Sequence, residues 1–262
     1  MADNTIALID THCHLDMDAY AQDLDAVMAR AAATGVRSVI TIGIDIQSSK
    51  KALQIANRYP QVFAAVGIHP HAAEKVTEDD FRSLAGLTTH KKVVGLGEIG
   101  LDYARQYAPE DVQQYIFSRQ LKLAKKLSLP VIIHDREAHE DTLLLLNKYA
   151  PYPAGGVMHC FSGDKTFAEK IIALGFFISI PGIVTFKNAA SLQEVVTALP
   201  LESMLIETDG PFLAPVPYRG KRNEPGYVIH TAEKIAELTG LDIKKIAAAT
   251  TRNARSLFHL NL

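Results

Sequence analysis

Eight short runs of apolar and β-branched residues recur along the whole chain and constrain its fold most strongly. Several of them, such as VVGLG and PVIIH, are almost continuously hydrophobic. Strands that are covered on both faces have this composition, because neither face contacts solvent. The eight predicted strands cover residues 6–11, 36–42, 62–67, 93–97, 130–133, 156–159, 176–180 and 204–207.

Stretches with helical spacing lie between these runs. Over residues 21–33, Leu24, Val27 and Ala31 recur on one helical face, and residues 112–127 have the same kind of spacing. Because strands and helices alternate, we expect parallel strand pairing with right-handed crossovers.

An open, doubly wound sheet is the alternative fold with this alternation. Such sheets usually carry a glycine-rich phosphate-binding turn after the first strand. Here the first strand runs instead into the segment DTHCH, residues 10–14. The length of 262 residues is close to the ~250 typical of a TIM barrel. We therefore predict an α/β fold with one domain over residues 1–262, a single (β/α)8 TIM barrel with its active site at the C-terminal ends of the strands.

Composition excludes several classes of protein but selects no substrate. Lys and Arg number 27 and Asp and Glu 29, so the formal net charge is −2, and 48% of the residues are hydrophobic. Collagen-like, disordered and disulfide-scaffold chains have other compositions. A nucleic-acid contact would therefore have to come from a local basic patch rather than from a global positive field.

The apolar runs are too short for a signal peptide or a membrane span. We therefore expect a cytoplasmic protein with no membrane partner, and we predict no protein partner. The two cysteines, Cys13 and Cys160, lie far apart in the sequence, and we expect reduced thiols rather than a disulfide. Each neighbours a histidine and would point to the opposite face, so we interpret both as small buried residues.

Histidines and carboxylates gather at the ends of the predicted strands. In a TIM barrel these ends meet at one rim, where the active site is built. Six of the ten histidines lie at such ends, and acidic residues follow the fourth and eighth strands. These residues are His12, His14, His69, His71, His134 and His159, with Glu98 and Asp209.

The pair His12 and His14 is the sharpest local signal for a metal site. Side chains two positions apart in a strand point to one face, so both rings can bind the same ion. Imidazoles and carboxylates are the usual ligands of Zn²⁺ and similar divalent ions. Two deeper acids, Asp10 and Glu207, either orient ligands or are buried structural acids. More donors gather than one tetrahedral ion needs, so we predict two divalent ions per chain (Zn, Mg or Mn) held by His12, His14, Glu98, His134, His159 and Asp209.

Six segments at the strand ends form a joint pattern: DTHCHLD (10–16), GIHPH (67–71), GLGEIGLDY (95–103), PVIIHDRE (130–137), MHCFSG (158–163) and IETDGP (206–211). Together they resemble the TatD-type metal-dependent deoxyribonucleases, a branch of the amidohydrolase-like barrels, over essentially the whole chain. A His-x-His pair alone is shared by all amidohydrolase barrels, whereas GEIGLD with ETDGP is specific. Many amidohydrolases place a carboxylated lysine on the fourth strand, and this chain has Glu98 there, as TatD proteins do.

The resemblance implies a hydrolase that cleaves phosphodiester bonds in DNA with two metal ions. The DNA partner would be single-stranded and cleaved from its 3′ end by an exonuclease activity. By the family's pattern one ion would be held by His12, His14 and Asp209 and the other by His134 and His159, with Glu98 bridging them.

Other polar residues near the rim are candidates for catalysis and substrate binding. Asp209 can orient or deprotonate the attacking water. His69 is not needed as a ligand, so we assign it to phosphate binding or leaving-group protonation rather than to a structural cap. A loop after the eighth strand carries an aromatic and three cations that can stack a base and hold a phosphate, although a solvated loop is the alternative. The predicted catalytic residues are Asp209, Glu98 and His69, and the predicted substrate-binding residues are His69, Arg136, Tyr218 and Arg219.

Three other functions are compatible with these features. An amidohydrolase of a cyclic amide, lactone or ester would activate water with the same ions, so the ligands do not exclude it. A deacylase of aminoacyl-tRNA would combine nucleic-acid contacts with ester cleavage. A non-catalytic metal-binding or interaction protein is expected to have lost a ligand, and none is lost here. Glu98 and the basic residues 219–222 favour the phosphodiester.

Overall fold

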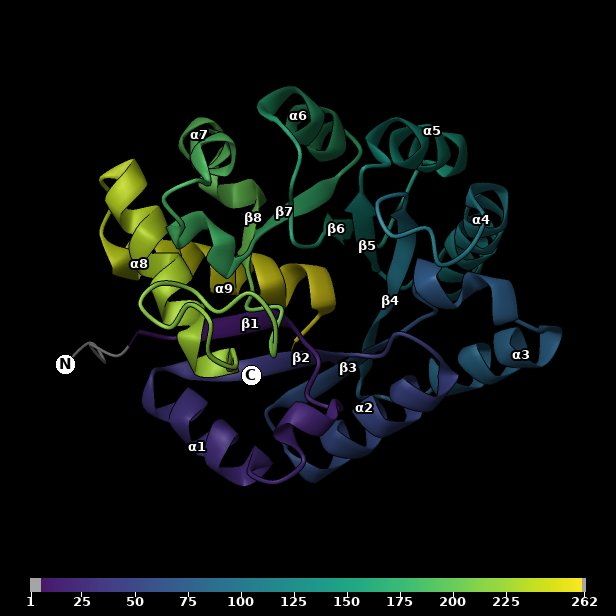
Figure 1. The fold of residues 1–262 in the computed structure, drawn as a ribbon, viewed down its shortest axis with the longest axis horizontal. Helices are drawn as coiled ribbons and strands as arrows, with labels where there is room; N and C mark the ends of the chain where they lie inside the picture. Colours follow the sequence, from purple (N-terminus) through teal and green to yellow (C-terminus); the bar gives the residue numbers. More distant parts are fainter. Residues whose placement is uncertain (1–5, 261–262) are drawn as a thin grey trace.

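Eight parallel strands form the central sheet, in the order β1 to β8 (Figure 1). The computed structural model describes residues 6–260, and within this range each strand pairs in parallel with the next along the chain. Helices surround the sheet, so the prediction of a (β/α)8 barrel is confirmed. The strands are β1 (Leu8–Cys13), β2 (Val36–Ile42), β3 (Val62–Val66), β4 (Val93–Asp102), β5 (Val131–Arg136), β6 (Gly156–Met158), β7 (Phe176–Ile180) and β8 (Met204–Ile206).

Two of the strands extend well beyond their predicted C-terminal ends. β4 continues past Gly97 to Asp102, and β5 continues to Arg136. The pairing of β4 with β5 includes Gly100 opposite His134, so the backbone ladder persists where polar side chains begin. Side chains of the site on these two strands are therefore held by the sheet itself.

Nine α-helices lie within the described range, and most of them connect one strand to the next. The predicted helix over residues 112–127 is α4, which begins slightly earlier, at Glu110. The helix predicted over residues 21–33 begins only at Leu24, because residues 18–20 form a separate 3₁₀ turn. The helices are α1 (Leu24–Ala33), α2 (Ile46–Arg58), α3 (Glu78–Leu87), α4 (Glu110–Leu127), α5 (His139–Tyr149), α6 (Lys165–Ala173), α7 (Ala190–Ala198), α8 (Val228–Thr239) and α9 (Ile243–Phe258).

Hydrogen bonds join the first strand to the segment that follows the last one. The Asp209 N–H donates to the His12 carbonyl at 2.9 Å. The buried Asp10 carboxylate accepts the N–H of Thr208 at 2.9 Å and its hydroxyl at 2.6 Å. Asp10, whose role the sequence left open, therefore has a structural role in bringing the two ends of the sheet together.

Apolar side chains fill the barrel interior, and α9 closes its end away from the site. Phe258 is 2% exposed and belongs to the same buried cluster as residues from several of the strands. Such interior packing is typical of TIM barrels, whose centre is a core rather than a pore. The cluster contains Ile9, Ile40, Ile42, Ala65, Ile132, Val157 and Leu205 from the strands, with Ala254, Leu257, Phe258 and Leu260.

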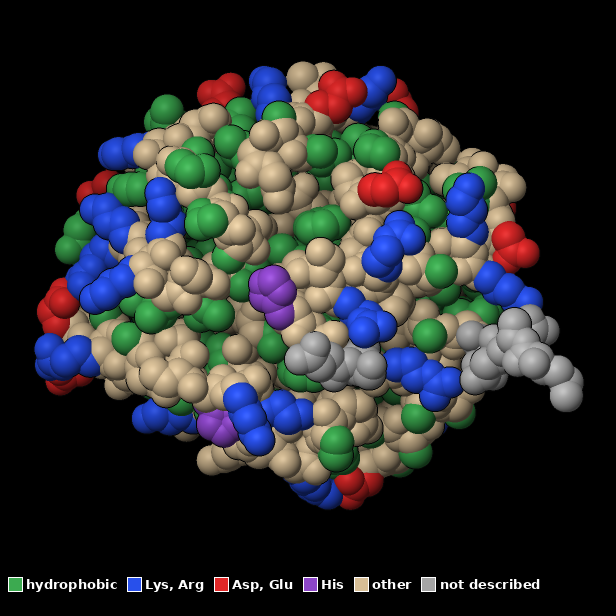
Figure 2. Space-filling model, turned by 180° about the vertical axis from the view of Figure 1, so that it is seen from behind, with side chains coloured by type: hydrophobic (Ala, Val, Ile, Leu, Met, Phe, Trp, Pro, Cys, Tyr) green, Lys and Arg blue, Asp and Glu red, His purple; other side chains and the backbone are tan. Residues whose placement is uncertain are grey.

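The face of the molecule opposite to that seen in Figure 1 carries side chains of several chemical types. Lys and Arg side chains are interspersed there with acidic, polar and hydrophobic ones, and the histidines on it are isolated from one another (Figure 2). No helix within residues 6–260 combines the length and the hydropathy that crossing a bilayer requires.

Candidate metal centre

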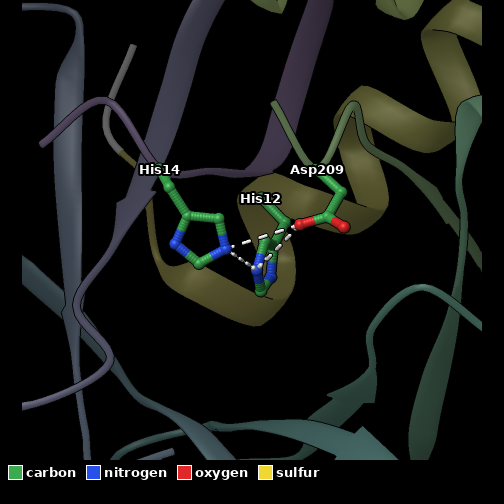
Figure 3. A group of neighbouring side chains, drawn as sticks. All are labelled: His12, His14 and Asp209. Atoms are coloured by element: carbon green, nitrogen blue, oxygen red, sulfur yellow. Dashed lines mark hydrogen bonds and ion pairs between the residues drawn. The ribbon is translucent and has the colours of Figure 1, made fainter. Parts of the chain in front are cut away.

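The six predicted metal ligands lie together at the C-terminal rim of the barrel. The rings of His12 and His14 and the carboxylate of Asp209 point toward one another, although about three quarters of the chain separates the histidines from the aspartate (Figure 3). Three groups of side chains have all their potential ligand atoms within 4.8 Å of one another. These groups are His12–His14–Asp209, His12–Glu98–His159 and His69–Glu98–His134.

Glu98 lies at the centre of the site, and its two oxygens face different imidazoles. Oε2 lies 3.4 Å from Nε2 of His12 and 3.8 Å from Nε2 of His14. Oε1 lies 2.6 Å from Nδ1 of His134 and 2.9 Å from Nε2 of His159. One carboxylate therefore lies between two pairs of imidazole nitrogens, although His12 and His159 also form one group with Glu98.

Glu98 is ionised despite being almost completely buried. Burial alone would raise its pKa, but the nearby imidazoles of His159 and His69 outweigh burial and hold the pKa of Glu98 well below its usual value. Asp209 is similar, since the hydrogen bond from His14 outweighs burial and lowers the pKa of the Asp209 carboxyl. The site therefore contains at least two buried negative charges that need positive partners.

Two of the histidines donate their outer ring nitrogen to a fixed acceptor. Nδ1 of His14 lies 3.2 Å from the carbonyl oxygen of Ile42, which can only accept, so this nitrogen carries a proton. Nδ1 of His159 lies 3.2 Å from the Glu207 carboxylate, which also accepts the Cys160 N–H at 2.7 Å. Glu207 therefore orients His159, one of the two roles that the sequence left open, and Nε2 of both rings faces the site.

Asp102 orients a third histidine, although it was not among the predicted site residues. Its Oδ2 lies 3.3 Å from Nε2 of His134 and 2.7 Å from Nε2 of His71. Nδ1 of His134 is then the nitrogen that faces Glu98. The signal that could have identified Asp102 is the GEIGLD motif, but the predicted strand ended at Gly97, before the aspartate.

At the centre of the site, imidazole nitrogens and carboxylate oxygens face one another and need a positive charge between them. Nε2 of His12 lies 3.4 Å from Nε2 of His14, and both face the same carboxylate oxygen. Burial alone would lower the pKa of His14, but the Asp209 carboxylate raises it, and Glu98 likewise raises the pKa of the buried His159. Lone pairs facing carboxylates in this way need a proton or a metal ion between them, and the donor set is the one that divalent ions prefer.

His69 differs from the other histidines at the centre. Its Nδ1 accepts the N–H of His71 at 3.1 Å, so the proton of the neutral ring is on Nε2. Nε2 points into the site, 3.5 Å from Oε1 of Glu98. Burial lowers the pKa of His69 to about 4, so the ring is neutral at pH 7. In this geometry Nε2 of His69 can donate a hydrogen bond into the site, although His69 also belongs to one of the three groups with clustered ligand atoms.

A cavity of about 840 Å³ opens above these residues. Arg136, which was predicted to bind substrate, lines it. Lys75 and Arg105, which were not among the predicted site residues, also line it from the segments after β3 and β4. The cavity therefore combines buried acids and imidazoles at its floor with cations at its rim.

The predicted residues Arg219 and Tyr218 are not among the residues that line this cavity. The Arg219 guanidinium lies over the ring of Phe186, 4.3 Å from its centroid. The Tyr218 ring is stacked on that of Tyr227 with 4.1 Å between centroids. Contact of either residue with substrate stays a prediction.

The two cysteines are free thiols, as expected, but only one of them is buried. Cys13 is fully buried, and its Sγ lies near the Tyr20 hydroxyl. Cys160 is half-buried and lines the cavity, so its predicted burial is wrong. β6 has already ended at Met158, and Cys160 has a left-handed φ of 44°, so the alternation of a strand does not apply to it.

Comparisons with known proteins give a consistent result. The profile of a family described as TatD related DNase matches residues 9–259. A Bacillus subtilis protein named as an uncharacterized metal-dependent hydrolase, YabD, is 44% identical, with 97% of this chain and 100% of that protein covered. A Salmonella typhimurium protein named 3′-5′ ssDNA/RNA exonuclease TatD is 35% identical, with 97% and 99% covered. The crystal structure of YjjV, a TatD homologue from Escherichia coli K12, has a TM-score of 0.92 at 34% identity, with 97% and 98% covered.

Proposed function

Because this chain belongs to the TatD related DNase family of metal-dependent hydrolases, we propose that it cleaves phosphodiester bonds in DNA with two divalent ions. The preferred substrate in this proposal is a single strand, digested from its 3′ end. The Salmonella relative named as a 3′-5′ ssDNA/RNA exonuclease supports that choice.

The observation that carries the two-ion proposal is the division of Glu98 between two sets of imidazoles. Its Oε2 faces His12 and His14, whereas its Oε1 faces His134 and His159. One ion would be held by His12, His14 and Asp209, and the other by His134 and His159, with Glu98 shared. Bound divalent ions supply charge neutralisation at the phosphate and acidify a water molecule.

The side chains of this chain contribute orientation and proton transfer. The lowered pKa of Asp209 keeps its carboxylate ionised, so it can accept a hydrogen bond from the attacking water and orient it. The Nε2–H of His69 can donate to a phosphate oxygen or to the leaving oxygen. Arg136 at the rim supports attraction of the phosphate backbone.

A panel of substrates tests the proposed reaction. Protein stripped of metal would be reloaded with Zn²⁺, Mg²⁺ or Mn²⁺ and offered labelled single-stranded DNA, duplex DNA, RNA, aminoacyl-tRNA and lactones. We expect metal-dependent shortening of single-stranded DNA from its 3′ end. Metal-dependent hydrolysis of the lactones without cleavage of any nucleic acid would contradict the proposal.

The variant Asp209→Asn tests the site within that assay. Asp209 has a left-handed φ of 56°, which asparagine tolerates well, so the variant should fold normally. We expect it to lose cleavage of single-stranded DNA while its melting temperature stays close to that of the wild type. A matched control is Asp141→Asn, whose carboxylate accepts from Tyr103 at the β4–α5 contact and not at the centre. Cleavage at the wild-type rate by Asp209→Asn would contradict the role of this residue.

A further inference from the structure

Phe212 is a large apolar residue that is exposed at the wall of the metal-site cavity. It follows Asp209 by three residues, and 48% of its surface is exposed. Its ring lies 6.2 Å from that of His14, edge to face. Leu213 beside it is 39% exposed and lines the same cavity. Adjacent apolar side chains at the wall of a cavity that also holds polar groups are typical of a ligand-binding site.

The backbone beneath this ring is firmly fixed, so its exposure does not result from a loose loop. The Phe212 N–H donates to the Asp209 carbonyl at 3.0 Å. Nδ2 of Asn223 donates to the Phe212 carbonyl at 2.7 Å and to the Thr208 carbonyl at 2.7 Å. Asn223 is itself fully buried, and its carbonyl accepts the Tyr20 hydroxyl at 2.6 Å. Phe212 is therefore a preorganised platform, held in register with Asp209.

The cavity wall is cationic on the arc of the barrel away from Phe212. Lys75, Arg105 and Arg136 come from β3, β4 and β5 or from the segments that follow them, whereas Phe212 and Leu213 follow β8. Among residues 6–260, no carboxylate lies within ion-pair distance of these three cations.

The cations of the loop after β8 are engaged within the protein instead. Arg222 pairs with Asp23 and Glu224, and Arg219 lies over Phe186. The unpaired cations that a substrate can meet are therefore on the β3–β5 arc, where the ring of Tyr107 is also exposed, and the exposed side chains of Phe212 and Leu213 are on the β8 arc. A ligand with an anionic backbone and apolar flat groups matches this division.

We propose that Phe212 stacks against one of the two nucleobases that flank the scissile phosphate. This inference rests on the proposed nuclease function and assigns the base-binding element of the same site. With the phosphate over Glu98, the backbone runs toward Arg136 and Arg105, and the base lies on the Phe212 ring beside Leu213. Stacking on an aromatic ring does not depend on base identity, because every base has a π-face. The enzyme therefore requires a base at this position without selecting which one.

The test compares substrates with and without the base. A 3′-labelled oligothymidylate would be compared with the same strand carrying a tetrahydrofuran abasic residue at the terminal or at the penultimate position. The proteins would be wild type, Phe212→Ala, Phe212→Trp and the control Tyr115→Ala. Tyr115 is 59% exposed on α4 and is not among the residues that line the cavity.

On the complete strand we expect Phe212→Ala to lower kcat/KM by about 5- to 150-fold, the size of one base–aromatic stack. Phe212→Trp should retain activity, and Tyr115→Ala should match wild type. On one of the two abasic strands, wild type and Phe212→Ala should have equal kcat/KM values, because the base that stacks on Phe212 is then missing. Equal rates for Phe212→Ala and wild type on the complete strand, or the same fold-loss on all three strands, would overturn the inference alone. A wild-type protein that cleaved none of the three strands would overturn the proposed function as well.

Discussion

At the scale of single residues, the site is organised by hydrogen-bond acceptors on the outer side of the predicted histidine ligands. The carbonyl of Ile42 and the carboxylates of Glu207 and Asp102 each accept a hydrogen bond from one ring nitrogen of a histidine. The other nitrogen of each ring is then directed inward. Such outer partners fix the tautomer of a metal ligand and raise its basicity, so they affect the metal without touching it.

Asp102 is the outer partner whose removal is most informative. In Asp102→Asn the negative charge behind His134 is lost, while a side chain of the same shape remains. We expect metal affinity or activity to fall by about 10- to 100-fold. A titration of activity against metal concentration measures the change, with Asp141→Asn as the control. An unchanged titration curve would show that Asp102 has no influence on the centre.

His69 is predicted to act on the substrate and not on the metal. Since its Nε2 carries the proton of a neutral ring and can donate a hydrogen bond, His69→Phe should keep the full metal content while kcat falls by about 10²- to 10³-fold, the effect of losing one hydrogen-bond donor to the transition state. The factor should be constant from pH 6 to 9, because the pKa of about 4 keeps the ring neutral throughout. Metal content by elemental analysis is the deciding measurement, and loss of one ion in His69→Phe would identify His69 as a ligand.

Site residues at the ends of strands could be found from the sequence. Residues whose role depends on the direction in which their side chain points could not. His12, His14 and Asp209 could be found because strand ends converge in a barrel. Asp102 was missed because the predicted strand ended at Gly97, before Glu98, whereas the ladder of β4 continues through Ile99 and Leu101 to Asp102. The exposure of Phe212 was also missed, since it depends on hydrogen bonds from Asn223, which lies in a separate loop.

At the scale of elements, the close approach of β4 and β5 explains the glycines of the GLGEIG segment. A Cβ on Gly97 would lie 2.5 Å from Cβ of Ile132, and one on Gly100 would lie 1.9 Å from the His134 carbonyl oxygen. Gly100 also has a φ of 147°, which other residues rarely adopt. These glycines let the strand that carries Glu98 approach the strand that carries His134.

The helix α9 is the element whose packing contributes most visibly to the barrel core. Phe258 is buried against the interior of the strands, so Phe258→Ala would leave a cavity there. We expect this variant to lower the free energy of unfolding by about 3 to 5 kcal/mol. Urea unfolding measures the change, and Leu144→Ala on α5, where the leucine is 64% exposed, is the control. A loss below about 1 kcal/mol, within the range of surface substitutions, would contradict this packing role.

At the scale of the whole molecule, barrel closure brings distant residues into one centre. Asp10 and Thr208 fasten the ends of the sheet together, and this contact places Asp209 beside His12. The overall alternation of strands and helices could be predicted from the sequence, because each strand is apolar on both faces. Which loop side chains point toward the cavity could not be predicted from the sequence. Arg105 and Arg219, for example, both have the sequence context of an exposed cation, but only Arg105 lines the cavity.

The central claim is that one carboxylate, Glu98, is shared by two divalent ions. The most direct measurement is an anomalous-difference map from crystals of the protein loaded with Mn²⁺. We expect two peaks separated by about 3.5 to 4 Å, one near His12, His14 and Asp209 and the other near His134 and His159, with Glu98 between them. A single peak at saturating Mn²⁺, or two peaks that do not share Glu98, would contradict the account.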